Sequence, residues 1–487
     1  MADVGLSSGM RWSGISVVGR EGSRIVFTIA LARLVGPEAF GIVAQAVVYI
    51  GIVGLLLDQG FSSALIQRPK VEPGMPGAVV SVNLAVGAVL TLVTLAVAPL
   101  WADFMATPEL TWVLAALAPS LLIRAASITP RALLLRTMDF RRIGIADIAS
   151  ALVGGVLGVL AAVLGASYWA LVVQLVSTDV VLVLVMLMVG AGSRPNLRMG
   201  LVRAIAGFSW RAFAAGLLIN SVSRNVDKLL VGRFQGPEAL AFYGLAYRLL
   251  LLPVQLVSQT IGAVLFPAFS RLADDLAALR AELERATRAL AALALPAMAL
   301  VAAAAPQLVP LLFGPQWTPA TPIVQVLAMA GAVQTIYHPS TTPLVLGLGQ
   351  AALNLRYAWL TAGVALAGVV AGLPFGAFGV AVGYTAATAL LVPVEWLIRR
   401  HLLGMSLRGQ AATLAPGVHL AAWVAGAYLL VAVAIPGNDL LVLALGLPVA
   451  AAAGLAVLRL VHRQQLAELV HMANRVVGRE STVDSAV

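Results

Sequence analysis

Long apolar stretches recur along the whole chain. Residues 77–100, 166–190, 289–305 and 440–458 are examples, and each is close to the roughly 20 residues that an α-helix needs to cross a bilayer. A spanning segment must satisfy its backbone hydrogen bonds internally, which favours helices. A membrane β-barrel is excluded because its strands alternate polar and apolar residues, and these stretches do not. The sequence therefore predicts an all-α polytopic membrane protein.

Composition agrees with this prediction and excludes several function classes. The chain is 61% hydrophobic and 11% charged, whereas a soluble domain carries about 25% charged residues. It contains no cysteine, which rules out disulfides, thiolate catalysis and cysteine-ligated metals. The histidines are scattered without metal-ligand spacing, so we expect no metal site and no cofactor: His338, His401, His419, His462 and His471.

The basic residues predict the orientation of the chain in the membrane. The net charge is +10, but nearly all basic residues are arginines near the ends of apolar stretches, which favours anionic lipid headgroups over nucleic acid as their partner. Basic residues gather in alternate loops, as in the loop with Arg131, Arg136, Arg141 and Arg142. Such loops stay in the cytoplasm, so both termini are expected there. The N-terminus lacks the features of a removable signal peptide, so the first helix is expected to be retained.

Hydropathy predicts about fourteen transmembrane helices. The expected spans are 12–34, 39–59, 77–101, 111–128, 144–164, 166–190, 208–232, 238–262, 283–305, 320–338, 353–373, 375–398, 412–435 and 438–460. The longest stretch expected to be non-helical covers residues 266–282.

An internal repeat divides the chain. SRIVFTIALARLVGPEA begins at Ser23 and SRNVDKLLVGRFQGPEA at Ser223, so serine, arginine and the GPEA turn recur at an offset of 200. Six predicted spans separate the copies, and an even number makes the two repeats parallel, with a shared site between the halves. The expected domains are two six-helix lobes (1–200 and 201–400), two additional C-terminal helices (401–460) and a cytoplasmic tail (461–487).

Charged residues inside the first predicted span need an explanation, since a charge at the bilayer centre costs at least about 2.5 to 3.5 kcal/mol. This span contains Arg20, Glu21 and Arg24. At 1.5 Å per residue, Arg20 lies roughly 12 Å and Arg24 roughly 18 Å beyond an entry near residue 12. Both arginines share one face of the helix.

The seventh span, which is the repeat partner of the first, carries Asn220, Arg224, Asp227 and Lys228, and the eighth adds Arg248. These polar stripes are expected to face each other across the groove between the halves. One interpretation is a set of internal ion pairs that hold the helices together. The other is a water-filled cavity with a surplus of positive charge, in which the forked donors of arginine bind an anion such as a pyrophosphate.

The second interpretation defines the candidate site. The expected substrate-binding residues are Arg20, Arg24, Arg224, Lys228 and Arg248, and the expected supporting or ion-coupling residues are Glu21, Asn220 and Asp227. Four other charged residues are assigned packing or interfacial roles: Arg124, Asp147, Asp179 and Glu395. The site contains no nucleophile–base pair, which indicates binding and transport rather than catalysis.

Several motifs resemble the bacterial polysaccharide transporters of the MATE-like flippase superfamily, in particular the colanic-acid and teichuronic-acid exporter branch. They are LARLVGPEAFGIVA from Leu31, DQGFSSALIQR from Asp58, LLLRTMDFRRIGIADI from Leu133, RNVDKLLVGRFQGPEALAFYGLAYRLLLLPVQ from Arg224, LFPAFSRL from Leu265 and LLFGPQWTPA from Leu311. The resemblance covers roughly the first two thirds of the chain.

The resemblance implies a MATE-like flippase fold in the bacterial cytoplasmic (inner) membrane. The implied cargo is an undecaprenyl-pyrophosphate-linked oligosaccharide, moved to the outer leaflet by alternating access of two six-helix lobes. Arg24, Arg224 and their neighbours would bind the pyrophosphate. Membrane lipids, a polysaccharide polymerase and export machinery are the implied partners, and such a transporter can work as a monomer.

Three alternatives stay open at this point. A flippase for the peptidoglycan precursor lipid II would share the fold and the basic cavity. A cation-coupled drug exporter would have twelve helices and an acidic site, whereas this chain has a basic surplus and two further spans. A membrane glycosyltransferase or polysaccharide polymerase would need a large catalytic loop, and residues 266–282 are too few for one.

Overall fold

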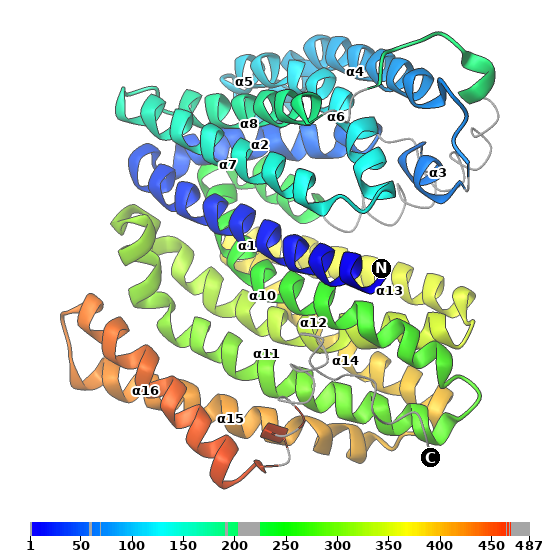
Figure 1. Cartoon of the computed structure of the whole chain (residues 1–487). Helices are drawn as coiled ribbons and strands as arrows, with labels where there is room; N and C mark the ends of the chain where they lie inside the picture. Colours follow the sequence, from blue (N-terminus) through cyan, green and yellow to red (C-terminus); the bar gives the residue numbers. More distant parts are fainter. Residues whose placement is uncertain are drawn as a thin grey trace. The chain divides into compact units, whose positions relative to one another are not determined.

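The computed structural model describes residues 2–57, 61–68, 70–189, 193–202, 225–463, 465–466 and 468. In this part of the chain every regular element is a helix (Figure 1). The chain divides into two compact units, Met1–Ala241 and Phe242–Val487. The all-α prediction is confirmed.

Unit 1 is built from a series of helices that pack around a buried apolar core of leucine, isoleucine, valine and alanine side chains. Its helices are α1 (Ala2–Val35), α2 (Pro37–Gly54), α3 (Phe61–Gln67), α4 (Met75–Met105), α5 (Leu110–Leu117), α6 (Pro119–Arg136), α7 (Phe140–Val163) and α8 (Trp169–Met188), followed by a helical segment over residues 225–234. Helix α7 packs against both α1 and α8, and α6 packs against α4 and α8.

Unit 2 begins inside α10 and contains its own apolar core. Its helices are α10 (Gly236–Arg271), α11 (Leu276–Phe313), α12 (Thr321–Gly347), α13 (Ala351–Gly372), α14 (Gly376–Leu403), α15 (Leu407–Ala434) and α16 (Asp439–Leu460), with 3₁₀ turns at Pro315–Ala320 and Leu373–Phe375. Helix α11 packs against α12 and α15, α13 pairs with α14, and α16 packs on α15.

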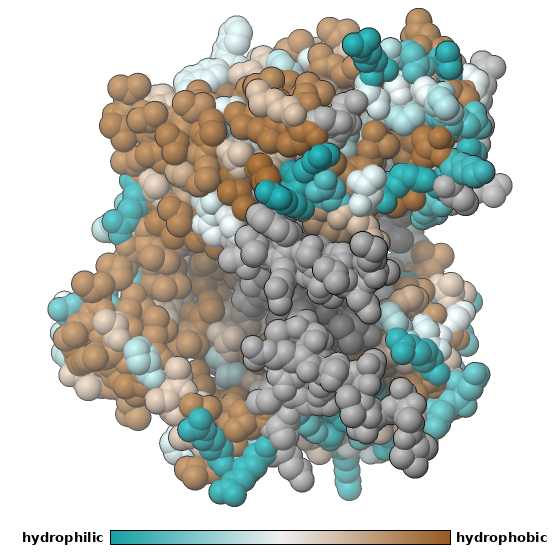
Figure 2. Space-filling view, viewed as in Figure 1, coloured by the Kyte–Doolittle hydropathy of each residue, from teal (hydrophilic) through white to brown (hydrophobic). Residues whose placement is uncertain are grey.

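The surface is that of a protein in lipid. Ten stretches of the described residues are long and apolar enough to span a membrane, and one of them, Ala351–Leu403, holds both α13 and α14. Large apolar side chains on these helices are exposed, such as Leu100, Leu430 and Val433 at 66%, 73% and 79%. Figure 2 shows such side chains over broad areas and hydrophilic side chains in small groups. The chain is therefore a multi-pass membrane protein.

The two GPEA copies have the same backbone conformation. Gly36 has φ 84° and Gly236 has φ 86°, a left-handed region that glycine enters without strain. In the first copy, Pro37 is the first residue of α2, where its missing N–H costs no helical hydrogen bond. Each copy therefore stops one helix and starts the next, as the sequence predicts.

Several predicted boundaries are wrong: α1 begins at Ala2 rather than 12, α11 ends at Phe313 rather than 305, and α12 ends at Gly347 rather than 338. Two further differences change how the chain is interpreted. The stretch 266–282 is helical except for residues 272–275, because α10 continues to Arg271 and α11 begins at Leu276, where Asp275 caps it by accepting hydrogen bonds from the N–H groups of Ala277 and Ala278. The fourth span ends at Arg136 rather than 128, because α6 remains helical after its apolar part. Arg131 is therefore inside a helix and not in a loop.

Candidate functional site

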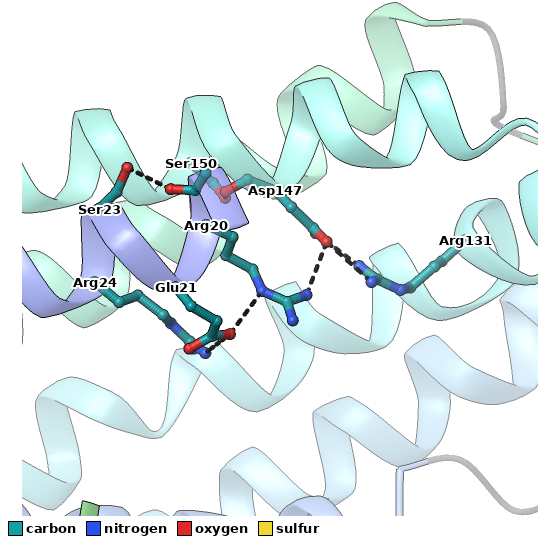
Figure 3. A network of polar contacts seen from close by, with 8 residues as sticks. Arg20, Glu21, Ser23, Arg24, Arg131, Asp147 and Ser150 are labelled. Carbon is teal, nitrogen blue, oxygen red and sulfur yellow. Dashed lines mark hydrogen bonds and ion pairs between the residues drawn. The ribbon is translucent and has the colours of Figure 1, made fainter. Parts of the chain in front are cut away.

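The charged stripe of α1 meets a carboxylate on α7. Arg20 Nη1 donates a 3.0 Å hydrogen bond to Asp147 Oδ2, and its Nε donates one of 3.0 Å to Glu21 Oε1. Figure 3 shows Asp147 between Arg20 and a second arginine, Arg131 of α6. Arg131 holds the same carboxylate with two bonds, of 2.8 Å to Oδ1 and 3.1 Å to Oδ2. One buried acid thus joins three helices.

Glycines bring α1 and α7 close enough for this contact. A Cβ atom at Gly155 of α7 would lie 2.1 Å from the ring of Phe27 on α1, and one at Gly19 would lie 2.8 Å from Ile148. Small residues at such crossings allow close helix packing in membranes. Gly19 of α1 and Gly155 of α7 therefore allow the approach that puts Asp147 within reach of Arg20.

Arg24 lies one turn further along α1 and is the most available arginine of the stripe. Its side chain is 62% exposed, and its ion pair with Glu21 has a length of 3.5 Å. The neighbouring Arg20 is 30% exposed and has two partners of 3.0 Å. Of the two arginines predicted on α1, Arg24 can thus reach a ligand with less loss of existing contacts.

A second intramembrane ion pair lies between α6 and α8. Arg124 Nε donates a 2.8 Å hydrogen bond to Asp179 Oδ2, and Asp179 is buried. Arg24 is near enough for its charge to act on the same carboxylate. The ion pairs of unit 1 described so far involve four arginines (Arg20, Arg24, Arg124 and Arg131) and three carboxylates (Glu21, Asp147 and Asp179).

The surplus of positive charge in this cluster is therefore smaller than the sequence indicates. The four arginines exceed the three acids by one charge. Ion pairs therefore connect the helices of unit 1, as the first interpretation expects, and the water-filled anion-binding cavity stays a prediction.

The other predicted site residues are placed as follows. Arg224 and Asn220 lie outside the described residues. Asp227 and Lys228 belong to the helical segment 225–234 of unit 1, where Asp227 is buried and Lys228 is half-buried. Arg248 is exposed on α10 of unit 2. The expected meeting of the two stripes across a groove therefore stays a prediction.

Sequence reasoning missed Arg124, Arg131, Asp147 and Asp179 as members of a charged cluster. Arg124, Asp147 and Asp179 look isolated along the chain, since Arg20 and Asp147 are 127 positions apart, and Arg131 is expected in a basic loop. The signal that could have found them is their depth, because a charged group inside a spanning helix almost always has a partner or a function.

Unit 2 contains a separate buried polar cluster around Arg399 of α14. Its Nη1 donates to Thr287 Oγ1 at 3.1 Å, and its Nη2 donates to Ser340 Oγ at 2.7 Å and to Thr341 Oγ1 at 3.1 Å. One turn earlier on the same helix, Glu395 accepts a hydrogen bond from Tyr357 of α13. Glu395 therefore has partners on neighbouring helices and is not a lone residue.

Comparison with known proteins identifies the family. Residues 30–322 match the family described as polysaccharide biosynthesis protein. The chain belongs to this polysaccharide biosynthesis protein family.

Three characterised bacterial proteins are distant relatives of this chain. The lipopolysaccharide biosynthesis protein WzxC of Escherichia coli (strain K12) is 25% identical over 411 residues, covering 82% of each chain. The succinoglycan biosynthesis transport protein ExoT of Rhizobium meliloti (strain 1021) is 28% identical over 364 residues, 74% of this chain and 72% of ExoT. The teichuronic acid biosynthesis protein TuaB of Bacillus subtilis (strain 168) is 25% identical over 367 residues, 73% of each chain.

Solved structures of other proteins identify the fold of this chain. A lipid II flippase, MurJ, in an inward closed conformation has a TM-score of 0.73 at 12% identity, covering 93% of this chain and 99% of MurJ. An inward-facing multidrug resistance MATE family transporter has a TM-score of 0.55 at 16% identity, covering 80% and 96%. The predicted MATE-like flippase fold is therefore confirmed.

Proposed function

We propose that this protein is a flippase that moves an undecaprenyl-pyrophosphate-linked oligosaccharide repeat unit across the bacterial cytoplasmic membrane for export of a surface polysaccharide. Its relatives are named as polysaccharide biosynthesis proteins, which supports a role in that process, and ExoT is named as a transport protein. The fold supports translocation, since it is shared with a lipid II flippase and a multidrug transporter. Alternating access of two lobes then moves the cargo, without a catalytic step on it.

The arginine cluster of unit 1 is the observation that carries the proposal. Arginines inside spanning helices are costly, and this cluster contains four of them against three acids, an excess of one positive charge within the cluster. A pyrophosphate is an anion that guanidinium groups bind through charge-assisted hydrogen bonds. In this proposal Arg24 contacts the pyrophosphate first, because it is the most exposed of the cluster.

The residues predicted from the second repeat complete the proposed site. Arg224, Lys228 and Arg248 add positive charge from the other copy, and Asn220 and Asp227 support them or couple an ion. The sugars pass through the hydrated cleft while the lipid tail stays in the membrane. Both termini face the cytoplasm in this orientation, which puts the arginine-rich loops on the cytoplasmic side.

Two alternatives are less well supported. A lipid II flippase agrees with the fold, but the likeness to MurJ rests on 12% identity, whereas relatives at 25% and 28% identity are named for polysaccharide biosynthesis. A membrane polymerase or glycosyltransferase would need a catalytic loop, and the stretch expected to be the longest loop is mostly helix.

Deletion of the gene tests the proposal. Lipid-linked oligosaccharides are extracted and identified while surface polysaccharide is measured in the same cells. The proposal predicts accumulation of a complete undecaprenyl-pyrophosphate repeat unit on the cytoplasmic side and loss of the surface polymer. An incomplete or absent repeat unit would instead indicate an enzyme that acts earlier in assembly, and loss of viability would indicate the peptidoglycan precursor.

A further inference from the structure

The pair of Arg124 and Asp179 lies near the middle of two stretches that are long and apolar enough to span a membrane. Helix α8 is ~30 Å long, and Asp179 lies ~15 Å from its first residue. Arg124 is likewise near the centre of the spanning stretch Leu110–Arg136, ~21 Å from its start. Both groups are therefore near the middle of their spanning stretches. A charge has its highest cost at that depth.

An ion pair at this depth is not explained by stability alone. Replacing a buried ion pair by packed apolar side chains is often neutral or stabilising, because desolvation of two charges offsets their attraction. The neighbours of the pair on α2 and α5 are apolar, including Val47, Ile50 and Leu117. An apolar pair would fit these surroundings, so the charges indicate a function.

The pair borders a cavity within unit 1. The cavity lies between α2, α5, α6 and α8, and the centre of a water molecule can reach about 80 Å³ of it. A site needs roughly 10–15 Å³ on this measure to hold one water. Ser120, Arg124 and Asp179 are its polar lining, so there is space for a small polar ligand group beside the guanidinium.

The geometry of Arg124 leaves donors for such a group. Within the part of the chain that the structure describes, the guanidinium group of Arg124 donates a hydrogen bond through Nε alone. The Arg124 side chain is 40% exposed. Arg131 in contrast holds Asp147 with both terminal nitrogens. The terminal nitrogens of Arg124 are the part of the guanidinium fork that binds phosphate in a bidentate way.

We propose that Arg124 is an anion-binding residue of the cavity and that Asp179 is its exchangeable counter-ion. The ligand class is a phosphate or pyrophosphate group. Asp179 neutralises Arg124 while the cavity is empty of anion, and the anion replaces Asp179 as the partner of Arg124 when it enters. The inference rests on the proposed function, since the pyrophosphate of the lipid-linked cargo is the anion concerned.

The experiment is calorimetric titration of purified protein in detergent with inorganic pyrophosphate. Asp179→Asn removes the competing charge and is expected to tighten binding about fivefold or more. Arg124→Gln removes the donors and is expected to weaken binding at least about tenfold. In Arg124→Gln protein the additional change Asp179→Asn should have no effect, because Asp179 acts through Arg124. Unchanged, weaker or absent binding in Asp179→Asn would overturn the proposal.

Two further variants keep the test decisive. Arg124→Leu with Asp179→Leu replaces the pair by apolar side chains, a change compatible with folding, and should still weaken binding about tenfold; undiminished binding in this variant would reject the role of Arg124. Glu284→Gln removes the acid of a 3.0 Å pair with Arg280 on α11 and should leave binding unchanged.

The gene deletion separates failure of this inference from failure of the proposed function. Accumulated repeat unit in the deletion strain, together with unchanged pyrophosphate binding in Asp179→Asn, would keep the flippase and reject the counter-ion role.

Discussion

At the scale of single residues, Asp147 connects three helices of unit 1. Its side chain is 8% exposed, and it accepts hydrogen bonds from Arg20 on α1 and from Arg131 on α6. Arg20 and Arg131 are held close together because both bind this carboxylate. Loss of the carboxylate leaves two positive charges close together without their common partner.

We therefore expect Asp147→Asn to destabilise the protein by about 2 kcal/mol or more, the value of hydrogen bonds to charged groups. The measurement is the thermal unfolding temperature of the purified protein in detergent. Glu21→Gln is the matched control, since the ion pairs of Glu21 are with Arg20 and Arg24 on its own helix and should change stability by about 0.5 kcal/mol or less. Equal effects of the two variants would contradict the joining role of Asp147.

At the scale of helices, close packing depends on glycine. Gly368 and Gly383 bring α13 and α14 together, since a Cβ at Gly368 would lie 2.3 Å from the carbonyl oxygen of Gly383. Gly155 of α7 does the same toward Phe27 of α1, and this crossing is the one that positions the charged stripe.

Gly155→Ala should push α1 from α7 and cost about 1 to 3 kcal/mol, the range for an overpacked core. The same change in a Phe27→Ala background should cost much less, because the ring that the new methyl group meets is gone. Thermal unfolding of the four proteins in detergent gives both values. Gly22→Ala on α1 has no neighbour within 4 Å and should not destabilise; an equal loss in this control would mean that helix α1 responds to any added methyl group.

A chain of hydrogen bonds joins the middle of α15 to the residues that follow α16. Trp423 Nε1 can only donate, so its 2.9 Å bond makes Nε2 of His419 an acceptor and puts the proton of His419 on Nδ1. This Nδ1 then donates to His462 Nε2 at 3.0 Å. Burial and the neighbouring His419 lower the pKa of His462, which lies beyond the last spanning helix.

A lowered pKa favours neutral His462 in the folded protein. Its contribution to stability is therefore present above its unfolded pKa of about 6.5 and is lost as the pH falls through the folded value. The unfolding temperature should drop more between about pH 7.5 and about pH 5.5 in the natural protein than in His462→Gln, which keeps an acceptor but does not titrate. Parallel pH profiles would show that this histidine does not affect stability.

Hydropathy and the GPEA repeat predicted the helices. They did not predict which helices pack against each other. Apolar windows placed α4, α7 and α13 to α16 within a few residues, because a spanning helix must be apolar for its whole length. They ended too early at α6 and α10, where helices continue with polar residues such as Arg131 and Arg271. The Asp147 and Asp179 pairs escaped prediction because each joins helices that are distant in sequence, and hydropathy carries no information on which helices touch.

At the scale of the whole molecule, we propose that the chain moves a pyrophosphate-linked lipid across a membrane. The family and its relatives indicate transport in polysaccharide biosynthesis, and the arginines of unit 1 support our proposal that the cargo is an anion. Export in cells depends on many other proteins, whereas purified protein in liposomes depends on none of them.

The most direct measurement is therefore translocation in proteoliposomes that contain a fluorescent undecaprenyl-pyrophosphate-linked oligosaccharide, with an added glycosidase reporting how much of it is in the outer leaflet. The account predicts that the natural protein moves the lipid between leaflets, and that empty liposomes, Arg24→Ala and Arg224→Ala do not, although both variants insert normally. Arg285→Ala, which changes an exposed pair on α11, should transport normally. A natural protein that leaves the lipid in its original leaflet, or full transport by Arg24→Ala and Arg224→Ala, would contradict the account.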